Sequence, residues 1–180
     1  MFQRLRKLFW VGLGALMILA GGCVPQTTSR TGIDTSLFPQ ENIQKVAVLT
    51  FESPLMDPEA GPHISNLFEV NLQQLSVYKI AERAEIEKVL REKGLPLSPS
   101  LSAGAIRQIG DLLKVDGVIL GAVSQYGRFD LAFTARLVST KTGMVLWTVA
   151  QTGGRFFLPI SKVADETVRA AVLDLVKTMK

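Results

Sequence analysis

One histidine and a nearby group of carboxylates are the residues that could support catalysis. His63 stands at the expected start of a helix, and Glu52, Asp57 and Glu59 precede it in a loop after an expected strand. Such loops often form the sites of α/β folds, where His63 would act as a general base and the acids would bind a cation. No spacing here defines a coordination shell, and acids also favour a helix N-terminus. We therefore favour a solvated loop over a functional site.

Other reactive sites lack the residues that they require. A single cysteine excludes an internal disulfide and a thiolate zinc cluster, and a single histidine excludes a metal site with paired histidines. No serine stands in a G-x-S-x-G elbow, and residues 23–180 contain no G-x-G-x-x-G or G-x-x-x-x-G-K-S/T phosphate-binding motif. The sequence therefore predicts no catalytic residue, no metal, no cofactor and no small-molecule substrate.

The net charge of +4 comes mostly from the amino terminus. The chain has 20 Lys and Arg residues against 16 Asp and Glu, but Arg4, Arg6 and Lys7 stand in a segment without acids. Beyond them, 17 cations face 16 acids. Nucleic-acid binding needs clustered cations that displace counterions from phosphates, so we expect no nucleic-acid partner.

Residues 1–22 have the pattern of a secretory signal. Three cations precede the uncharged apolar run Leu8–Ala20, which ends in Gly21 and Gly22. A membrane-spanning helix is the alternative, but it needs about 20 apolar residues, and this run is shorter and contains glycines. We therefore favour a cleaved signal over a membrane helix.

Cys23 follows the small residues directly. The sequence Ala20-Gly21-Gly22-Cys23 resembles the lipobox of bacterial lipoproteins, which predicts cleavage after residue 22 and a lipid on Cys23. The alternative is an inert, buried cysteine. Val24 stands where an Asp would resemble the inner-membrane retention signal, so we expect a lipid anchor in the outer membrane, facing the periplasm.

Two parts follow the signal. Residues 23–42 comprise the lipidated cysteine and a polar segment without periodicity, which predicts a flexible tether. Residues 43–180 alternate between strand and helix patterns and are expected to form one domain. The expected strands are 45–51, 77–81, 117–124, 129–139 and 144–151, and the expected helices are 62–75, 83–93, one capped by Ser102, and 161–178.

This order predicts a single α/β domain with a mixed sheet of about five strands flanked by about four helices. A parallel crossover start leads into an antiparallel meander, joined by a turn that ends at Gly143. The crossover rule suggests that the early helices share one face. The regular apolar stripe of 161–178 is expected to cover the other, and Trp147 is expected in the core.

Arg155, Phe156 and Phe157 follow the flexible pair Gly153-Gly154 near the last strand. Phe and Arg are enriched at protein interfaces, so these residues are candidates for contact with a partner. The alternative is that at least one ring packs beneath the closing helix.

The order of the segments resembles a known family. The periplasmic domain of the CsgG family, the curli production assembly and transport lipoproteins, is similar to this chain over roughly Ile43–Thr152, as are the related LpoB-like activators of penicillin-binding proteins. The segments that carry the resemblance are Lys45–Phe51, Val77–Arg83, Ile86–Leu90, Val115–Val123, Ala135–Ser139 and Thr142–Trp147.

The resemblance implies a non-enzymatic accessory in envelope assembly or secretion, which contacts a protein partner or further copies of itself. Channel members resemble barrels with long spanning hairpins, whose strands need about 9–11 residues each. Only one hairpin here reaches that length, so we favour an accessory over a pore. The alternatives are an LpoB-like regulator of a peptidoglycan synthase and, less favoured, a hydrolase that uses His63.

Overall fold

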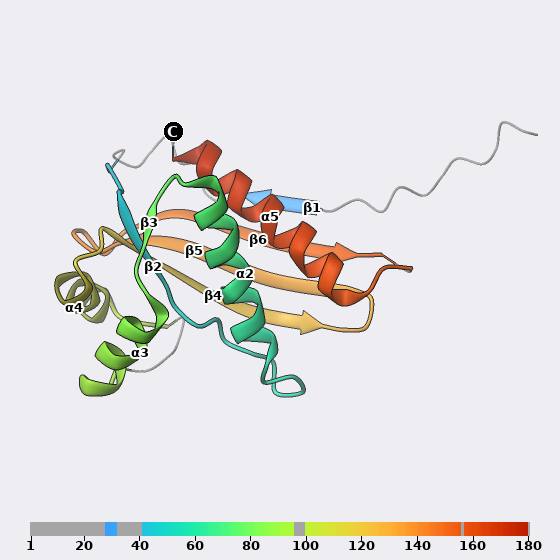
Figure 1. The fold of residues 1–180 in the computed structure, drawn as a ribbon, viewed down its shortest axis with the longest axis horizontal. Helices are drawn as coiled ribbons and strands as arrows, with labels where there is room; N and C mark the ends of the chain where they lie inside the picture. Colours follow the sequence, from blue (N-terminus) through green and yellow to red (C-terminus); the bar gives the residue numbers. More distant parts are fainter. Residues whose placement is uncertain (1–27, 32–40, 96–99, 156, 180) are drawn as a thin grey trace, which may run out of the picture.

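Among the residues that the computed structural model describes, 28–31, 41–95, 100–155 and 157–179, six strands form one sheet and four helices pack against it (Figure 1). The strands are β1 (Thr28–Thr31), β2 (Lys45–Val48), β3 (Lys79–Ile80), β4 (Gly117–Tyr126), β5 (Asp130–Ser139) and β6 (Val145–Gly154). The helices are α2 (Ala60–Leu75), α3 (Arg83–Glu92), α4 (Ala103–Leu113) and α5 (Ile160–Thr178).

The sheet has the order β1-β6-β5-β4-β2-β3. β2 pairs in parallel with both β3 and β4, whereas β4, β5 and β6 form an antiparallel meander of ten-residue strands. The predicted α/β class is confirmed, with all five expected strands present in one mixed sheet. Ser102 caps α4 as expected, since its Oγ accepts a hydrogen bond from the N–H of Ala105 at 3.2 Å.

A sixth strand, β1, was not predicted from the sequence. Thr28–Thr31 pair antiparallel with β6, with Thr28 opposite Thr152 and Thr31 opposite Val149. These four residues belong to the segment expected as a flexible tether, and the expectation is wrong for them. Residues 1–27, with the expected signal and Cys23, lie outside the described residues, so the signal and the lipid remain predictions.

The helices cover the two faces of the sheet in pairs. α2 and α5 lie side by side on one face, and α3 and α4 lie on the other (Figure 1). The expectation that all early helices share a face is therefore wrong for α2. The connection through α2 runs outward from β2 to β3, whereas the connection through α3 and α4 returns past β2 to β4. Right-handed connections that run in opposite directions lie on opposite faces.

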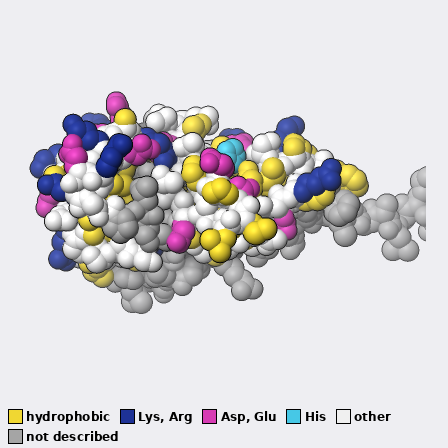
Figure 2. Space-filling view, turned by 90° about the horizontal axis from the view of Figure 1, so that it is seen from below, with side chains coloured by type: hydrophobic (Ala, Val, Ile, Leu, Met, Phe, Trp, Pro, Cys, Tyr) yellow, Lys and Arg dark blue, Asp and Glu magenta, His cyan; other side chains and the backbone are white. Residues whose placement is uncertain are grey.

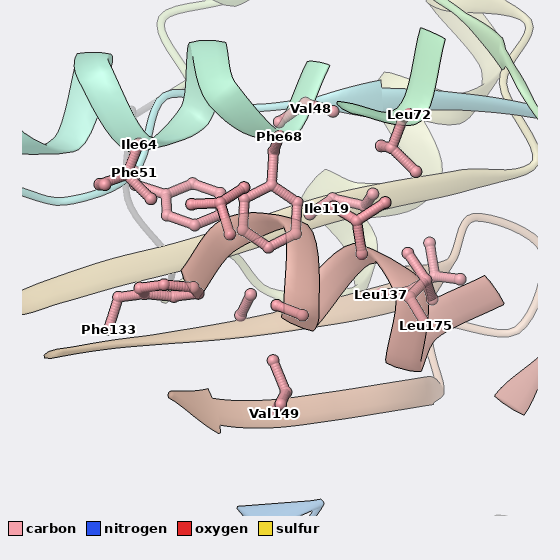
Figure 3. Packing of buried hydrophobic residues seen from close by; sticks show 14 of the residues in the cluster. Val48, Phe51, Ile64, Phe68, Leu72, Ile119, Phe133, Leu137, Val149 and Leu175 are labelled. Carbon is pink, nitrogen blue, oxygen red and sulfur yellow. The ribbon is translucent and has the colours of Figure 1, made fainter. Parts of the chain in front are cut away.

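The larger core lies between α2, α5 and the sheet (Figure 3). Phe51, Phe68 and Phe133 meet there, with ring centres 5.2 to 6.5 Å apart. Gly121 of β4 leaves room for them, because a Cβ at this position would stand 2.3 Å from the Phe51 ring. Trp147 is fully buried as expected, and its indole N–H donates to Asp174 Oδ2 of α5 at 2.9 Å.

The stripe on α5 faces its own sheet, as predicted. The buried residues of this helix are Val163, Ala164, Thr167, Val168, Ala171, Val172, Leu175 and Val176. A helix with one apolar face gains most of its stability from such packing rather than from propensity.

Asp116 joins the start of β2 to the start of β4. Its Oδ2 accepts hydrogen bonds from the backbone N–H groups of Gln44 and Lys45, each at 3.0 Å. Burial opposes ionisation of Asp116, but the two N–H groups and the charge of Lys141 outweigh burial and lower the pKa of the carboxyl. The ionised carboxylate therefore contributes to the stability of the fold.

We expect Asp116→Asn to lower the free energy of unfolding by about 1–2 kcal/mol at pH 7, because the charge-assisted bonds are weakened. A carboxyl with a lowered folded pKa gives stability above its ordinary pKa of 3.8 and loses it as the pH falls through the folded value. In urea unfolding, the variant should approach the wild type as the pH falls below 3.8. Asp111→Asn, on the exposed side of α4, is the control. If Asp116→Asn and the wild type differed equally in stability at pH 7 and below pH 3.8, the ionised carboxylate would not be the stabilising group.

Candidate interaction surface

No side-chain hydrogen bond joins His63 to Glu52, Asp57 or Glu59 in the described part of the chain. The ring of His63, in the first turn of α2, meets Tyr126 edge-on with centres 6.1 Å apart. Its Nε2 is buried, and no group among the described residues bonds to it. Burial and, less strongly, the charge of Asp57 raise the pKa of Tyr126. Glu52 and Glu59 are exposed, and within the described ranges no three His, Cys, Asp or Glu residues could hold a metal ion. An imidazole without a bonded carboxylate or hydroxyl lacks the geometry of an activated base.

Arg155 and Phe157, predicted as partner contacts, follow the end of β6. The backbone N–H of Arg155 donates to the carbonyl of Phe129 at 3.0 Å, and its guanidinium lies 3.5 Å from Glu166 of α5. Phe157 is 93% exposed, so its ring does not pack beneath the closing helix. Phe156 lies outside the described residues. The structure thus leaves Phe157 accessible, and its role in binding a partner stays a prediction.

Among the described residues, no helix covers part of the α3–α4 face of the sheet. The second core, beneath α3 and α4, includes Val118 and Leu120 from the first half of β4 but takes only Val138 from the end of β5. Because side chains alternate between faces, Thr134 and Arg136 of β5 and Thr148 of β6 point to this uncovered area. A groove of about 330 Å³ lies over it.

This uncovered area, which we call the open sheet face, is formed by small and polar side chains. Its residues are Ala122, Ala132, Thr134, Arg136, Thr148, Ala150 and Thr152, with Ser100 beside the groove. No motif in the sequence distinguishes them as a candidate site. Alternation within β5 and β6 separates them from the core residues, but the strand order decides which half of the sheet lacks a helix.

Arg83, at the start of α3, connects this helix to α2 and to the segment that follows β2. Its guanidinium donates to Thr50 Oγ1 at 3.0 Å and to Ser65 Oγ at 3.3 Å, and it forms an ion pair with Glu69 of α2. Burial raises the pKa of Glu69, while the charge and hydrogen bond of Arg83 act in the opposite direction. The side chains of Arg83 and Glu69 are only 25% and 16% exposed. This pair holds α2 against the end of β2, so its role is structural.

The chain is similar to known proteins in both sequence and fold. The family model described as "Curli production assembly/transport component CsgG" matches residues 27–129, which is more than half of the chain. The chain belongs to the CsgG family. The match spans β1 to the turn after β4, and the region of resemblance predicted from the sequence overlaps most of it. No curated protein sequence matches the chain.

Solved structures with a similar fold come from several bacteria. The PelC dodecamer from Paraburkholderia phytofirmans aligns with a TM-score of 0.55 at 18% identity, covering 86% of this chain and 98% of that chain. Lipoprotein GNA1162 from Neisseria meningitidis has a TM-score of 0.55 at 19% identity and covers 76% and 99%. The LpoB C-terminal domain from Escherichia coli has a TM-score of 0.51 at 12% identity and covers 62% and 83%. At such identities, these similarities establish the fold that the chains share.

None of the helices in the described part of the chain is long and apolar enough to cross a bilayer.

Proposed function

We propose that this protein is an outer-membrane lipoprotein, anchored through Cys23, whose CsgG-like domain faces the periplasm. It acts without catalysis, as an accessory in envelope assembly or secretion, through contacts with other proteins. Membership of the CsgG family supports the envelope role, and the isolated imidazole of His63 argues against hydrolysis. The observation that carries the proposal is the open sheet face.

The open sheet face has the chemistry of a protein contact. Thr134, Arg136 and Thr148 place polar side chains at a surface where alanines allow close approach. Fully buried interface centres are depleted in Lys and Glu, whereas Arg is enriched. Small substrates usually bind in closed, apolar pockets. A shallow groove with this lining is therefore better suited to a protein segment.

Self-association is the first form of contact that we propose. The solved PelC of the same fold is a dodecamer, which supports assembly of this chain with further copies of itself. The second candidate is regulation of a peptidoglycan synthase, as in LpoB-like proteins. It is supported by the fold shared with the LpoB C-terminal domain, which this chain matches over 83% of that domain.

Cross-linking from the open sheet face tests the proposal. A photo-cross-linking residue replaces Thr148 in the lipidated protein in intact cells, and a control replaces Asn66 on the exposed side of α2. We expect cross-links from position 148 and none from position 66. Bands at multiples of the chain mass support self-association, and one larger band that contains a cell-wall synthase supports the regulator. Cross-links from position 66 alone would reject the open sheet face as the contact.

Cys23→Ser should release the protein from the outer membrane or leave the precursor unprocessed. Each buried CH₂ of an acyl chain contributes about 0.8 kcal/mol to membrane attachment, so loss of the acyl chains removes the anchor. Metabolic labelling with a radioactive fatty acid measures the change, with the wild type as control. Label retained by the serine variant would contradict lipidation at Cys23.

A further inference from the structure

Three connections lie at the same end of the sheet. β2 and β4 run in parallel and β5 returns antiparallel, so the loop after β2 and the turn between β4 and β5 share this end. The connection from β6 to α5 joins them, because Gly154 pairs with Asp130 at the start of β5. β1 begins there as well, since Thr28 pairs with Thr152 near the end of β6. We call this region, formed by residues 52–59, 127–129, 155 and 157–159 around the start of β1, the loop end.

The most exposed apolar side chains of the described residues lie at the loop end. Leu55 is 102% exposed, Met56 95% and Phe157 93%, whereas every other exposed large hydrophobic residue of the described ranges is at most 47% exposed. Figure 2 shows hydrophobic and basic side chains together at the right-hand end of the molecule, where the connections after β4 and β6 lie in Figure 1. Apolar exposure concentrated at one end indicates a binding surface.

Hydrogen bonds hold Leu55 and Met56 outward. The N–H of Asp57 donates to the carbonyl of Pro54 at 3.0 Å, which closes a turn with Leu55 and Met56 at its tip. Ser53 Oγ donates to the carbonyl of Pro58 at 2.7 Å and accepts from the N–H of Gly61 at 2.9 Å. The loop is thus tied at both ends, and the two side chains gain no burial within their own fold. Turn tips usually carry polar residues or glycine, so the apolar pair Leu55 and Met56 indicates a contact outside the domain.

Basic side chains lie on the two connections of the loop end that follow β4 and β6. The guanidinium of Arg128 lies 5.1 Å from the centre of the Phe129 ring, and Arg155 lies beside Glu166 at 3.5 Å. Apolar tips with nearby arginines suit the interface of a bilayer, where the apolar groups enter the acyl boundary and the arginines meet phosphates.

We propose that the loop end rests on the lipid bilayer, with Leu55, Met56 and Phe157 inserted into its interface. This inference rests on the proposed anchor, because it needs lipid on Cys23. Only four residues lie between Cys23 and Thr28, and the five residue steps from one to the other span at most about 18 Å even when fully extended. The pairing of β1 with β6 therefore keeps the loop end close to the membrane that holds the lipid. The domain rests against the bilayer instead of hanging below it on a long tether.

Proximity favours lipid over a protein as the occupant. A group tethered next to a surface meets it at high effective concentration, so a few inserted side chains suffice for a lasting contact. Lipid and apolar tips act together as two membrane signals, which stable attachment of peripheral proteins commonly requires.

Site-specific fluorescence tests the contact in the full lipidated chain. A cysteine replaces Met56, Phe157 or, as the control, Met144, which is 41% exposed in the turn at the opposite end of the sheet. Lipidation occupies Cys23, so the new cysteine is the free thiol that an environment-sensitive dye labels. Each protein is reconstituted into vesicles of phosphatidylethanolamine and phosphatidylglycerol with a nitroxide-bearing lipid as quencher. We expect blue-shifted, lipid-quenched emission at positions 56 and 157 and neither effect at position 144.

The outcomes separate the contact from the anchor. Labels at 56 and 157 that behave like the label at 144, on chains whose Cys23 carries lipid by mass spectrometry, would overturn the contact and leave the proposed function intact. Labels shielded from a water-soluble quencher but not quenched by lipid would assign the loop end to a protein and also overturn it. A chain without lipid on Cys23 would contradict the proposed function and, with it, this inference.

Discussion

Val168→Asp is expected to unfold most of the domain at room temperature. Val168 lies in the middle of α5, is 0% exposed and belongs to the core that α5 and α2 form with the sheet. A carboxylate there would be buried without a partner, which costs several kcal/mol against a typical stability of about 5–15 kcal/mol. Circular dichroism during thermal melting should show loss of the cooperative transition or a large fall in its midpoint.

Leu173→Asp is the matched control for this prediction. Leu173 stands on the same helix but is 39% exposed, so the same change should leave the midpoint nearly unaffected. Sedimentation of both variants adds the oligomeric state. If Val168→Asp gave a stably folded monomer in place of a wild-type oligomer, α5 would be an assembly surface rather than a cover for its own sheet.

The sequence predicted α5 well because its pattern is local. Its apolar residues recur at helical spacing over five turns, and this periodicity determines both the helix and its buried side. The position of α2 on the same face depended on the sheet order, with β2 between β3 and β4. The periodicity of a single segment gives no information about the strand order. The helix α2 could therefore be predicted from the sequence, but the sheet face that it covers could not.

The strand β1 was missed for a related reason. Thr28–Thr31 has neither an apolar run nor alternation, which are the signals that identify a strand within the chain. Its pairing with β6 uses backbone groups, which every sequence offers. A polar edge strand of this kind forms because the neighbouring strand, here β6, offers unpaired backbone groups, and not because of its own side chains.

The candidate surfaces were predicted only in part. Gly153-Gly154 followed by Arg155, Phe156 and Phe157 suggested a contact with a partner, which stays a prediction; in the structure the two glycines end β6 and Phe157 is exposed. Leu55 and Met56 gave no signal, since two apolar residues in a loop are equally compatible with burial. Their exposure follows from the turn that the Asp57 N–H closes on Pro54, and this appears only in the structure.

Arg83 shows how a motif residue can serve the fold rather than a binding site. The segment Ala81-Glu82-Arg83 contributed to the family resemblance, but no function could be assigned to it from the sequence. In the structure, Arg83 ties α3 to Thr50 after β2 and to Ser65 and Glu69 of α2. The charge and hydrogen bond of Arg83 partly offset the burial that raises the pKa of Glu69.

We expect Arg83→Met to lower the free energy of unfolding by about 3 kcal/mol at pH 7, because it leaves Glu69 buried without its partner. Removal of Arg83 also removes the influence that lowers the pKa of Glu69, while burial and the charge of Glu87 continue to raise it above 4.5. A carboxyl whose folded pKa is raised binds more protons in the folded than in the unfolded state between the two pKa values, so stability falls as the pH rises through the folded value. The variant should therefore regain part of its lost stability, relative to wild type, as the pH falls from 7 toward 4.5.

The double variant Glu69→Gln/Arg83→Met separates this charge effect from the loss of packing by the arginine stem. It removes the titrating carboxyl, so chemical denaturation should show greater stability than the single variant at pH 7 and no recovery relative to wild type on acidification. A single variant whose loss is the same at both pH values would mean that Glu69 finds water or another cation. Arg83 would then act through its bonds to Thr50 and Ser65, and the coupling of α2 to the end of β2 would be a matter of hydrogen bonding rather than of charge.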